Sequence, residues 1–209
     1  MTIDEKQLKA IAQIKKFYPI SQIEIEKLQS FVAMLLQYNQ QYNLIGESTV
    51  QDVWHRHILD SAQLLQYIEN KNLVVGDFGS GAGFPAIVLS ILGVEQIHLI
   101  EKSFRKCEFL RLAAKVSDHK IIIHQKKVEE IKDLNFDIAT SRAFAPLDKL
   151  ITTVKPFLKS DGYGIFLKGK SFENEINLAK EHNKFHHTAQ PSLTSSESRV
   201  IIINQIINN

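Results

Sequence analysis

The stretch LVVGDFGSGAGFP at residues 73–85, together with IHLIE at residues 97–101, decides the fold of this chain of 209 residues. The apolar residues that begin the first segment are typical of a buried strand, and they lead into a turn with alternating glycines: Gly79, Gly81 and Gly83. An apolar helical run connects the two segments, and Pro85 suits its first turn because no N–H is needed there. The second segment ends in an acid, Glu101. This order predicts a βαβ unit that binds a nucleotide-like ligand.

The glycine spacing indicates which kind of ligand this turn binds. Read as G-x-G-x-G, the turn lacks the last glycine of the dinucleotide fingerprint, because Phe84, Pro85 and Ala86 follow it. The chain also contains no G-x-x-x-x-G-K-[ST] segment, so no phosphate-binding P-loop is predicted. A carboxylate at Glu101 suits the ribose diol of an adenosine group without phosphate. These features favour S-adenosylmethionine as the cofactor, with a ligand-free tight turn and a dinucleotide-dependent oxidoreductase as the alternatives.

The composition is that of an ordinary globular protein. Hydrophobic residues make up 44% of the chain and charged residues 23%, and the net charge of +2 is too small to indicate a nucleic-acid binder by itself. The single cysteine, Cys107, excludes an internal disulfide and is expected to be a small core residue. No signal peptide and no membrane-spanning apolar run are visible, so we expect a cytoplasmic protein without a membrane partner.

The hydrophobic pattern changes its period near residue 70. Residues 1–70 are predicted to form a helical N-terminal subdomain, with a capping box at Ser21 and Glu24 and a further helix over residues 50–67. Residues 71–209 are predicted to form a Rossmann-like domain, in which short strands alternate with helices and build a mostly parallel sheet. Its predicted strands span residues 73–78, 97–100, 121–124, 136–140 and 164–167. Two consecutive strands over residues 182–188 and 199–205 predict a C-terminal antiparallel hairpin, and the fold class is therefore α/β.

Basic residues stand at the predicted carboxyl ends of the strands, where ligands of such sheets bind. We expect these residues to converge on one edge and to contact phosphate: Lys102, Arg142, Lys168 and Lys170. At the end of the fourth strand, Arg142 and Phe144 stand where enzymes that methylate exocyclic amines commonly carry an acidic or Asn residue, so amine chemistry is disfavoured. A guanidinium beside a cationic sulfonium is unfavourable, so Arg142 is expected to face nucleic acid or a carboxylate.

The segment just before the glycine turn permits two interpretations. Arg56 and Asp60 are spaced to form a surface ion pair on an ordinary amphipathic helix. Alternatively, Arg56 and His57 lie at the rim of the cofactor pocket and contact RNA. Neither this segment nor the histidines near residue 182 complete a metal-ligand pattern with carboxylates or cysteines, so no metal site is predicted.

Several motifs in this order resemble the small-subunit ribosomal RNA methyltransferase G family, also called glucose-inhibited division protein B. The resemblance covers nearly the whole chain and is carried by YNLI at residues 42–45, RHILDS at 56–61, DFGSGAGFP at 77–85, SRAFAPL at 141–147 and LKG at 167–169, besides residues 106–110. It implies a class I methyltransferase fold that uses S-adenosylmethionine. It also implies methylation of N7 of a guanine in small-subunit ribosomal RNA, with that RNA or the 30S subunit as the partner.

The resemblance also implies the positions of the site residues. Those that would bind the cofactor are Gly79, Gly81, Phe84, Glu101, Val128, Glu129 and Arg142. From the residues themselves rather than from the resemblance, we expect RNA contacts from Arg56, His57, Arg142, Lys168 and Arg199, with Arg142 and Lys168 positioning the base or its phosphate. The chain departs from the family at Ala86, where a glycine is usual, and at Glu101, where Asp is frequent; both changes are conservative.

No residue is assigned as a general acid or base. Guanine N7 carries an in-plane lone pair and no hydrogen, so transfer to it needs proximity and in-line orientation rather than deprotonation. Two alternatives stay open, namely a methyltransferase with a different substrate and a noncatalytic RNA-binding or ribosome-assembly factor with a relic cofactor pocket. The intact glycine turn and its acid speak against a relic.

Overall fold

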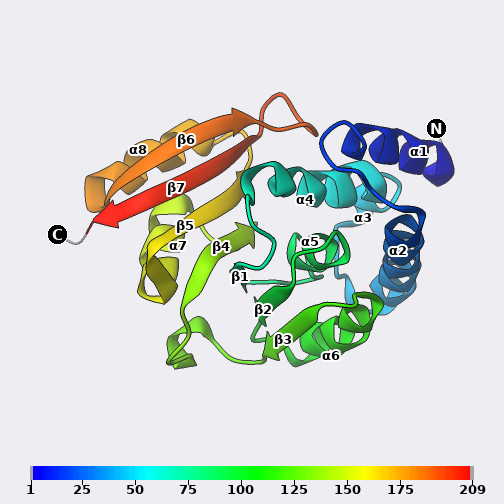
Figure 1. Ribbon diagram of the computed structural model, residues 1–209, viewed down its shortest axis with the longest axis horizontal. Helices are drawn as coiled ribbons and strands as arrows, with labels where there is room; N and C mark the ends of the chain where they lie inside the picture. The colour runs from blue at the N-terminus through cyan, green and yellow to red at the C-terminus, as the bar shows by residue number, and fades with distance from the viewer. Residues whose placement is uncertain (1, 208–209) are drawn as a thin grey trace.

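A computed structural model describes residues 2–207 of the chain, which form one seven-stranded sheet with helices on both faces (Figure 1). The strand order is β3-β2-β1-β4-β5-β7-β6. Five strands are parallel, and their bounds are β1 Val74–Phe78, β2 Gln96–Ile100, β3 Lys120–His124, β4 Phe136–Arg142 and β5 Leu158–Lys168. All five predicted strands are therefore confirmed, with β5 beginning earlier than the apolar pattern suggested.

The C-terminal strands β6 Lys184–Pro191 and β7 Arg199–Ile207 form the predicted antiparallel hairpin. The second of them, β7, also pairs antiparallel with β5, so that β6 becomes the outer edge of the sheet. The hairpin is long, and its connection reaches back toward the N-terminal helices (Figure 1).

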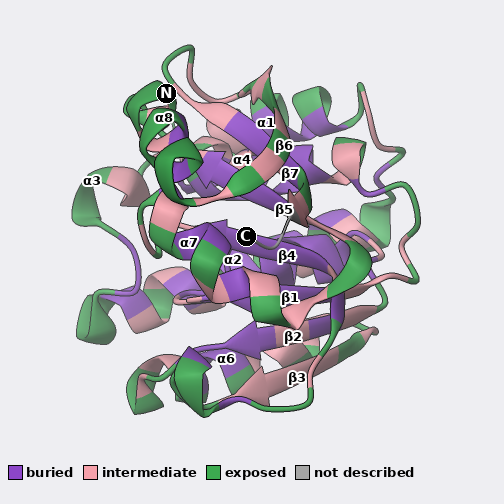
Figure 2. Cartoon of the chain, turned by 90° about the vertical axis from the view of Figure 1, so that its left-hand side faces the viewer, coloured by how far each residue is buried: buried purple, intermediate pink, exposed green. Residues whose placement is uncertain are grey.

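Helices cover the two faces of the sheet unequally. The N-terminal helices α1 Ile3–Ile14 and α2 Gln22–Tyr42, together with α5 Ala86–Ile91 and α6 Phe104–Ala113, cover one face. The other face carries α7 Leu147–Val154 and α8 Phe172–His182. The edge strand β3 stays only partly buried (Figure 2), because it has a neighbouring strand on one side only, although α6 contacts it. The short 3-10 turns η3 Ala114–Val116 and η4 Val128–Glu130 precede and follow it in the chain. A third 3-10 turn, η5 Lys155–Phe157, precedes β5.

The prediction that residues 50–67 are helical is confirmed, but the segment is not one regular α-helix. The segment instead comprises α3 Glu47–Val50, the π-helix η1 Trp54–Leu59, the single turn α4 Asp60–Ala62 and the 3-10 helix η2 Gln63–Tyr67. A π-helix widens the backbone turn and is often found at functional sites. In this chain it overlaps the first four residues of the RHILDS segment.

The N-terminal helices share a core with the sheet. The capping box at Ser21 is confirmed, since Ser21 Oγ accepts from the Glu24 N–H at 3.2 Å and the Glu24 carboxylate accepts from the Ser21 N–H at 2.7 Å. The fully buried Phe31 of α2 lies 5.3 Å, ring to ring, from Phe84 in the glycine turn and 6.3 Å from Phe109 of α6. A division near residue 70 therefore remains a prediction, because one hydrophobic cluster extends across it.

Candidate active site

Two cavities adjoin each other at the carboxyl ends of the parallel strands. The smaller cavity, of about 490 Å³, is lined by residues from the ends of β1, β2, β3 and β4: Gly79, Ile100, Glu101, Lys102, Lys106, Lys126, Lys127, Val128, Glu129, Ala143 and Phe144. The larger cavity, of about 620 Å³, is lined mainly by the RHILDS segment, by residues 142–146 and 167–169, and by the β6–β7 connection. Ala143 and Phe144 line both cavities. The site therefore has two compartments with a common wall.

The glycine turn and Glu101 are joined directly. Glu101 is 8% exposed, and its carboxylate accepts from the N–H of Gly81 at 3.0 Å and from the N–H of Ser103 at 2.8 Å. Gly79 has a φ of +71°, and a Cβ at this position would collide with the ring of Phe144. Glu101, the predicted acid, is thus held against the turn by the N–H of Gly81, and Glu101 and Gly79 both line the smaller cavity.

Asp77 lies beneath the turn and is fully buried. Its Oδ1 accepts from the Thr140 hydroxyl at 3.0 Å, whereas Oδ2 has no partner among the described residues. Burial raises the pKa of Asp77 to about 7, even though hydrogen bonds and the nearby Arg142 favour the charged form. A buried acid with an unsatisfied oxygen directly under the turn is a polar feature that a cofactor amine or a water molecule would satisfy.

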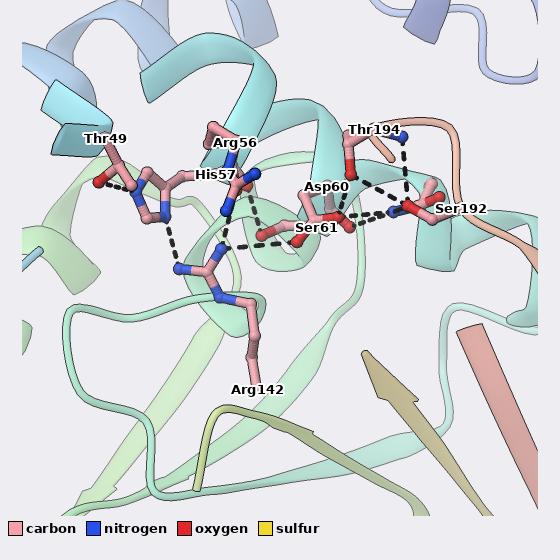
Figure 3. A network of polar contacts seen from close by, with 9 residues as sticks. Thr49, Arg56, His57, Asp60, Ser61, Arg142, Ser192 and Thr194 are labelled. Atoms are coloured by element: carbon pink, nitrogen blue, oxygen red, sulfur yellow. Dashed lines mark hydrogen bonds and ion pairs between the residues drawn. The ribbon is translucent and has the colours of Figure 1, made fainter. Parts of the chain in front are cut away.

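Arg142 joins β4 to the π-helix. Its Nη1 donates to the Arg56 carbonyl at 2.9 Å and lies 3.5 Å from a carboxylate oxygen of Asp60, and its Nη2 donates to Nδ1 of His57 (Figure 3). The guanidinium also lies over the ring of Phe84 at 5.0 Å. The expectation that Arg142 faces a carboxylate is confirmed, and the alternative pairing of Arg56 with Asp60 is wrong because Arg142 holds that carboxylate.

His57 is enclosed by this arrangement rather than presented at a rim. Its side chain is 6% exposed, it stacks on Phe84 at 4.9 Å, and its Nε2 lies 2.8 Å from Oγ1 of Thr49. Because Arg142 donates to Nδ1, the neutral ring carries its hydrogen on Nε2 and donates to Thr49. Burial, and then the charges of Arg142 and Arg56, lower the pKa of His57 to about 3. Both ring nitrogens are engaged, so His57 reaches RNA only by giving up one of these bonds.

Asp60 also anchors the connection between β6 and β7. The hydroxyl of Thr194 donates to Asp60 Oδ1 at 2.6 Å, and Gln63 Nε2 donates to the same oxygen at 2.9 Å (Figure 3). The N–H of Leu193 in turn donates to Gln63 Oε1 at 2.8 Å. One carboxylate thereby fixes two walls of the larger cavity, the end of β4 and the hairpin tip. Sequence reasoning missed this role, because no local pattern connects residues so far apart.

Three of the four basic residues predicted to converge at the strand ends line the two cavities, namely Lys102, Arg142 and Lys168. Lys168 binds Glu175 at 2.8 Å and donates to the Ala145 carbonyl at 2.6 Å, and Lys170 pairs with Glu197 at 3.1 Å. Arg142 is neutralised by Asp60, and Lys102 lines the smaller cavity. Arg142, Lys168 and Lys170 thus each pair with an acid, which the spacing of the basic residues alone did not reveal.

The remaining predicted site residues divide between the cavities and the core. Gly79, Glu101, Val128 and Glu129 line the smaller cavity, as a cofactor site at this place requires. Gly81 contributes its N–H to Glu101 without lining the cavity, and Phe84, at 3% exposure, packs inside. Arg199 lies 4.9 Å over the Phe172 ring and donates to the Ser196 and Ser198 carbonyls, beside the larger cavity but not in its wall. Cys107 is fully buried, as expected.

Comparison with known proteins decides the family. Residues 24–203 match the family described as rRNA small subunit methyltransferase G. The chain belongs to this family. A relative named ribosomal RNA small subunit methyltransferase G, from Orientia tsutsugamushi (strain Boryong), is 41% identical over 186 residues, which covers 89% of this chain and 93% of the relative. Membership of the methyltransferase G family removes the oxidoreductase alternative.

Solved structures support the class I methyltransferase fold of this methyltransferase G family chain. A ribosomal protein L11 methylase from Lactobacillus delbrueckii subsp. bulgaricus aligns with a TM-score of 0.61 at 21% identity, covering 72% of this chain and 79% of that one. Magnesium protoporphyrin IX methyltransferase from Synechocystis PCC 6803, solved with bound S-adenosylmethionine, aligns with a TM-score of 0.63 at 14% identity, covering 84% and 97%. At these identities the likeness concerns the fold.

The smaller cavity fits S-adenosylmethionine, the methyl donor used by this family and fold. Gly79 presents backbone without a side chain, Glu101 places a buried carboxylate beside it, and Asp77 leaves an unsatisfied oxygen beneath. Among residues 2–207, no group of three or more His, Cys, Asp or Glu side chains is arranged to hold a metal ion. No helix in the described part of the chain is long and apolar enough to span a membrane.

Proposed function

We propose that the protein transfers a methyl group from S-adenosylmethionine to N7 of a guanine in small-subunit ribosomal RNA. The single observation that carries this proposal is the shared wall of the two cavities, because methyl transfer needs a donor and an acceptor compartment that meet. The relatives are named as methyltransferases of small-subunit ribosomal RNA, and the family resemblance implies guanine N7 as the acceptor. The donor belongs in the smaller cavity and the acceptor in the larger one.

The chain's own residues supply binding and orientation. Glu101 would accept hydrogen bonds from the ribose hydroxyls, while the backbone at Gly79 lies against the donor. Bound S-adenosylmethionine supplies an electrophilic methyl carbon. The lone pair of guanine N7 forms the new C–N bond as the C–S bond breaks, and no proton has to leave the base. The absence of an assigned acid or base fits this reaction, in which the enzyme contributes mainly proximity and alignment.

The residues predicted to contact RNA differ in whether their side chains are free to do so. Arg56 is exposed, lines the larger cavity and forms no ion pair among residues 2–207, so we assign a phosphate contact to it. Arg142, His57 and Lys168 hold the cavity walls through internal bonds and position the base indirectly. Arg142→Ala is expected to lower methylation of intact small subunits strongly; unchanged methylation would contradict this positioning role.

Mapping N7-methylguanine tests the function. Small-subunit ribosomal RNA from cells with and without the gene is compared by borohydride and aniline cleavage, which breaks the chain at this base. We expect one guanine to lose its modification without the gene, and purified protein to restore it on 30S subunits or on naked RNA. An unchanged map would contradict the substrate assignment. RNA binding without any transfer would instead favour the noncatalytic assembly factor.

A further inference from the structure

Phe144 occupies the boundary between the two cavities. It lines both of them, and 41% of its surface is exposed although it is one of the larger apolar side chains of the protein. Ala143, which also lines both, offers only a methyl group. The ring of Phe144 is therefore the main surface that a ligand in either compartment meets at the boundary.

The backbone on both sides holds Phe144 in this place. Ala143 has a φ of +55°, a left-handed conformation that non-glycine residues rarely adopt, and it turns the chain directly before the ring. The next residue, Ala145, receives a hydrogen bond at its carbonyl from Lys168 at 2.6 Å. The N–H of Leu147 donates to Glu175 at 3.0 Å. The strained turn, tied down on its far side, projects an aromatic ring out of the core and over Gly79.

The surroundings of the ring suggest what it binds. Hydroxyl and charged groups such as Thr194 and Arg56 line the larger cavity together with apolar residues such as Pro146 and Leu167. The ring of Phe144 still keeps a solvent-exposed face there, so it does not serve only to fill the core. Aromatic side chains with a free face among polar and cationic groups are typical of sites that stack nucleobases. A volume of about 620 Å³ is within the usual range for a small-molecule site and admits one extruded nucleotide.

We propose that the acceptor guanine leaves its stack, enters the larger cavity and stacks on the ring of Phe144. This contact places N7 at the boundary with the smaller cavity, where the donor methyl group lies. The inference rests on the proposed function, because it assumes that an RNA base is the acceptor. Phe144 is thus the residue that aligns the acceptor, and Asp60 and Arg142 keep the surrounding walls in place.

The test separates acceptor stacking from cofactor binding. Three substitutions are compared: Phe144→Ala removes the ring, Phe144→Leu keeps apolar volume without a ring, and Phe144→Trp keeps an aromatic face. Phe104→Ala is the matched control, since Phe104 is 59% exposed and lines neither cavity. For each protein, the Kd of S-adenosylhomocysteine is measured by calorimetry. The kcat and KM for methyl transfer are measured on 30S subunits from cells without the gene.

We expect Phe144→Ala and Phe144→Leu to lose about 10-fold to 100-fold in kcat/KM for the subunits, which is the size of one base–aromatic stack. Their Kd for S-adenosylhomocysteine should stay within about 2-fold of the wild type, and Phe144→Trp should recover most of the transfer. Thermal unfolding checks that each variant folds. If Phe144→Ala does not fold, Phe144→Leu is the variant compared with the wild type.

Three results would overturn the inference. One is wild-type kcat/KM in Phe144→Leu, and another is a loss of cofactor affinity of about 10-fold or more, which would make Phe144 part of the donor site. The third is full impairment of Phe144→Trp. Methyl transfer to a position other than guanine N7 would contradict the proposed function alone, because the variants are compared on whichever base is modified. A wild-type protein without any transfer would contradict both.

Discussion

Nη2 of Arg142 donates a hydrogen bond to Nδ1 of His57, although the two residues are 85 positions apart in the sequence. Both residues were predicted to contact RNA, and in the fold they contact each other. The bond is possible because the π-helix presents the Arg56 carbonyl and the His57 ring toward the end of β4 together. Because the guanidinium of Arg142 and the imidazole of His57 bind each other inside the protein, they shape the wall of the larger cavity and add no free charge to it.

Stability should fall in acid because of His57. In the unfolded chain this histidine takes up a proton near pH 6.5, whereas in the fold its pKa lies at about 3, so protonation between these values favours unfolding. Between pH 7.5 and pH 5, we expect His57 to account for a loss of about 2 kcal/mol in the free energy of unfolding. His57→Gln, whose amide still accepts from Arg142 but does not titrate, should show a shallower pH dependence in urea unfolding.

The matched control for this prediction is His182→Gln, at an exposed position at the end of α8. His98 and His124 also have lowered pKa values through burial and act in the same direction, while buried Asp77 acts in the opposite one. These groups are common to all the proteins compared, so the difference between curves isolates His57. Parallel curves for wild type and His57→Gln would contradict the assignment.

Glu101→Gln should weaken the binding of S-adenosylmethionine. Both carboxylate oxygens accept backbone N–H groups, from Gly81 and Ser103, and an amide side chain has only one accepting oxygen. We expect a loss of about 10-fold or more in affinity by calorimetry, because the neutral amide accepts the ribose hydroxyls less well than the carboxylate, and a hydrogen bond to a charged group contributes about 1.5–3 kcal/mol. Glu108→Gln, at an exposed position on α6, should bind as the wild type does, and equal affinities for both variants would sink the prediction.

Asp60→Ala should release the hairpin tip. Thr194 and Gln63 lose their shared acceptor, and Arg142 loses its carboxylate. Hydrogen exchange of residues 192–198 should therefore accelerate by about 10-fold or more, and kcat/KM for the subunit should fall while cofactor affinity is kept. Glu197→Gln, in the same connection, breaks only an exposed ion pair with Lys170 and should leave the exchange unchanged. Unaltered exchange in Asp60→Ala would show that the tip is held by other contacts.

Gly76→Ala should destabilise the sheet. A Cβ on this residue of β1 would collide with the ring of Phe136 on β4, which is fully buried. We expect the free energy of unfolding to fall by about 1–3 kcal/mol, the usual cost of overpacking a core. Adding Phe136→Leu should recover part of this loss by making room. Gly46→Ala is the control, because a Cβ there meets nothing within 4 Å, and an equal loss at both glycines would contradict the packing argument.

The sequence predicted correctly those features that depend on residues close together in the chain. The βαβ unit, the capping box at Ser21 and the burial of Cys107 follow from periodicity, hydrogen bonding at helix ends and composition, and all are confirmed. Interactions between distant segments escaped prediction. Nothing near Lys168 in sequence reveals that Glu175 neutralises it, and nothing near Asp60 points to Thr194. The π-helix likewise depends on the tertiary setting, because its sequence fits an α-helix equally well.

Phe84 was expected to touch the cofactor, and it instead lies where α2, the π-helix and β4 come together. Its ring contacts Phe31, His57 and the guanidinium of Arg142. The glycine turn is therefore not expected to unfold independently of the elements that pack on Phe84. Heat or denaturant that loosens α2 also removes packing from Phe84 in this turn, so donor binding and the native fold should be lost together in a single transition.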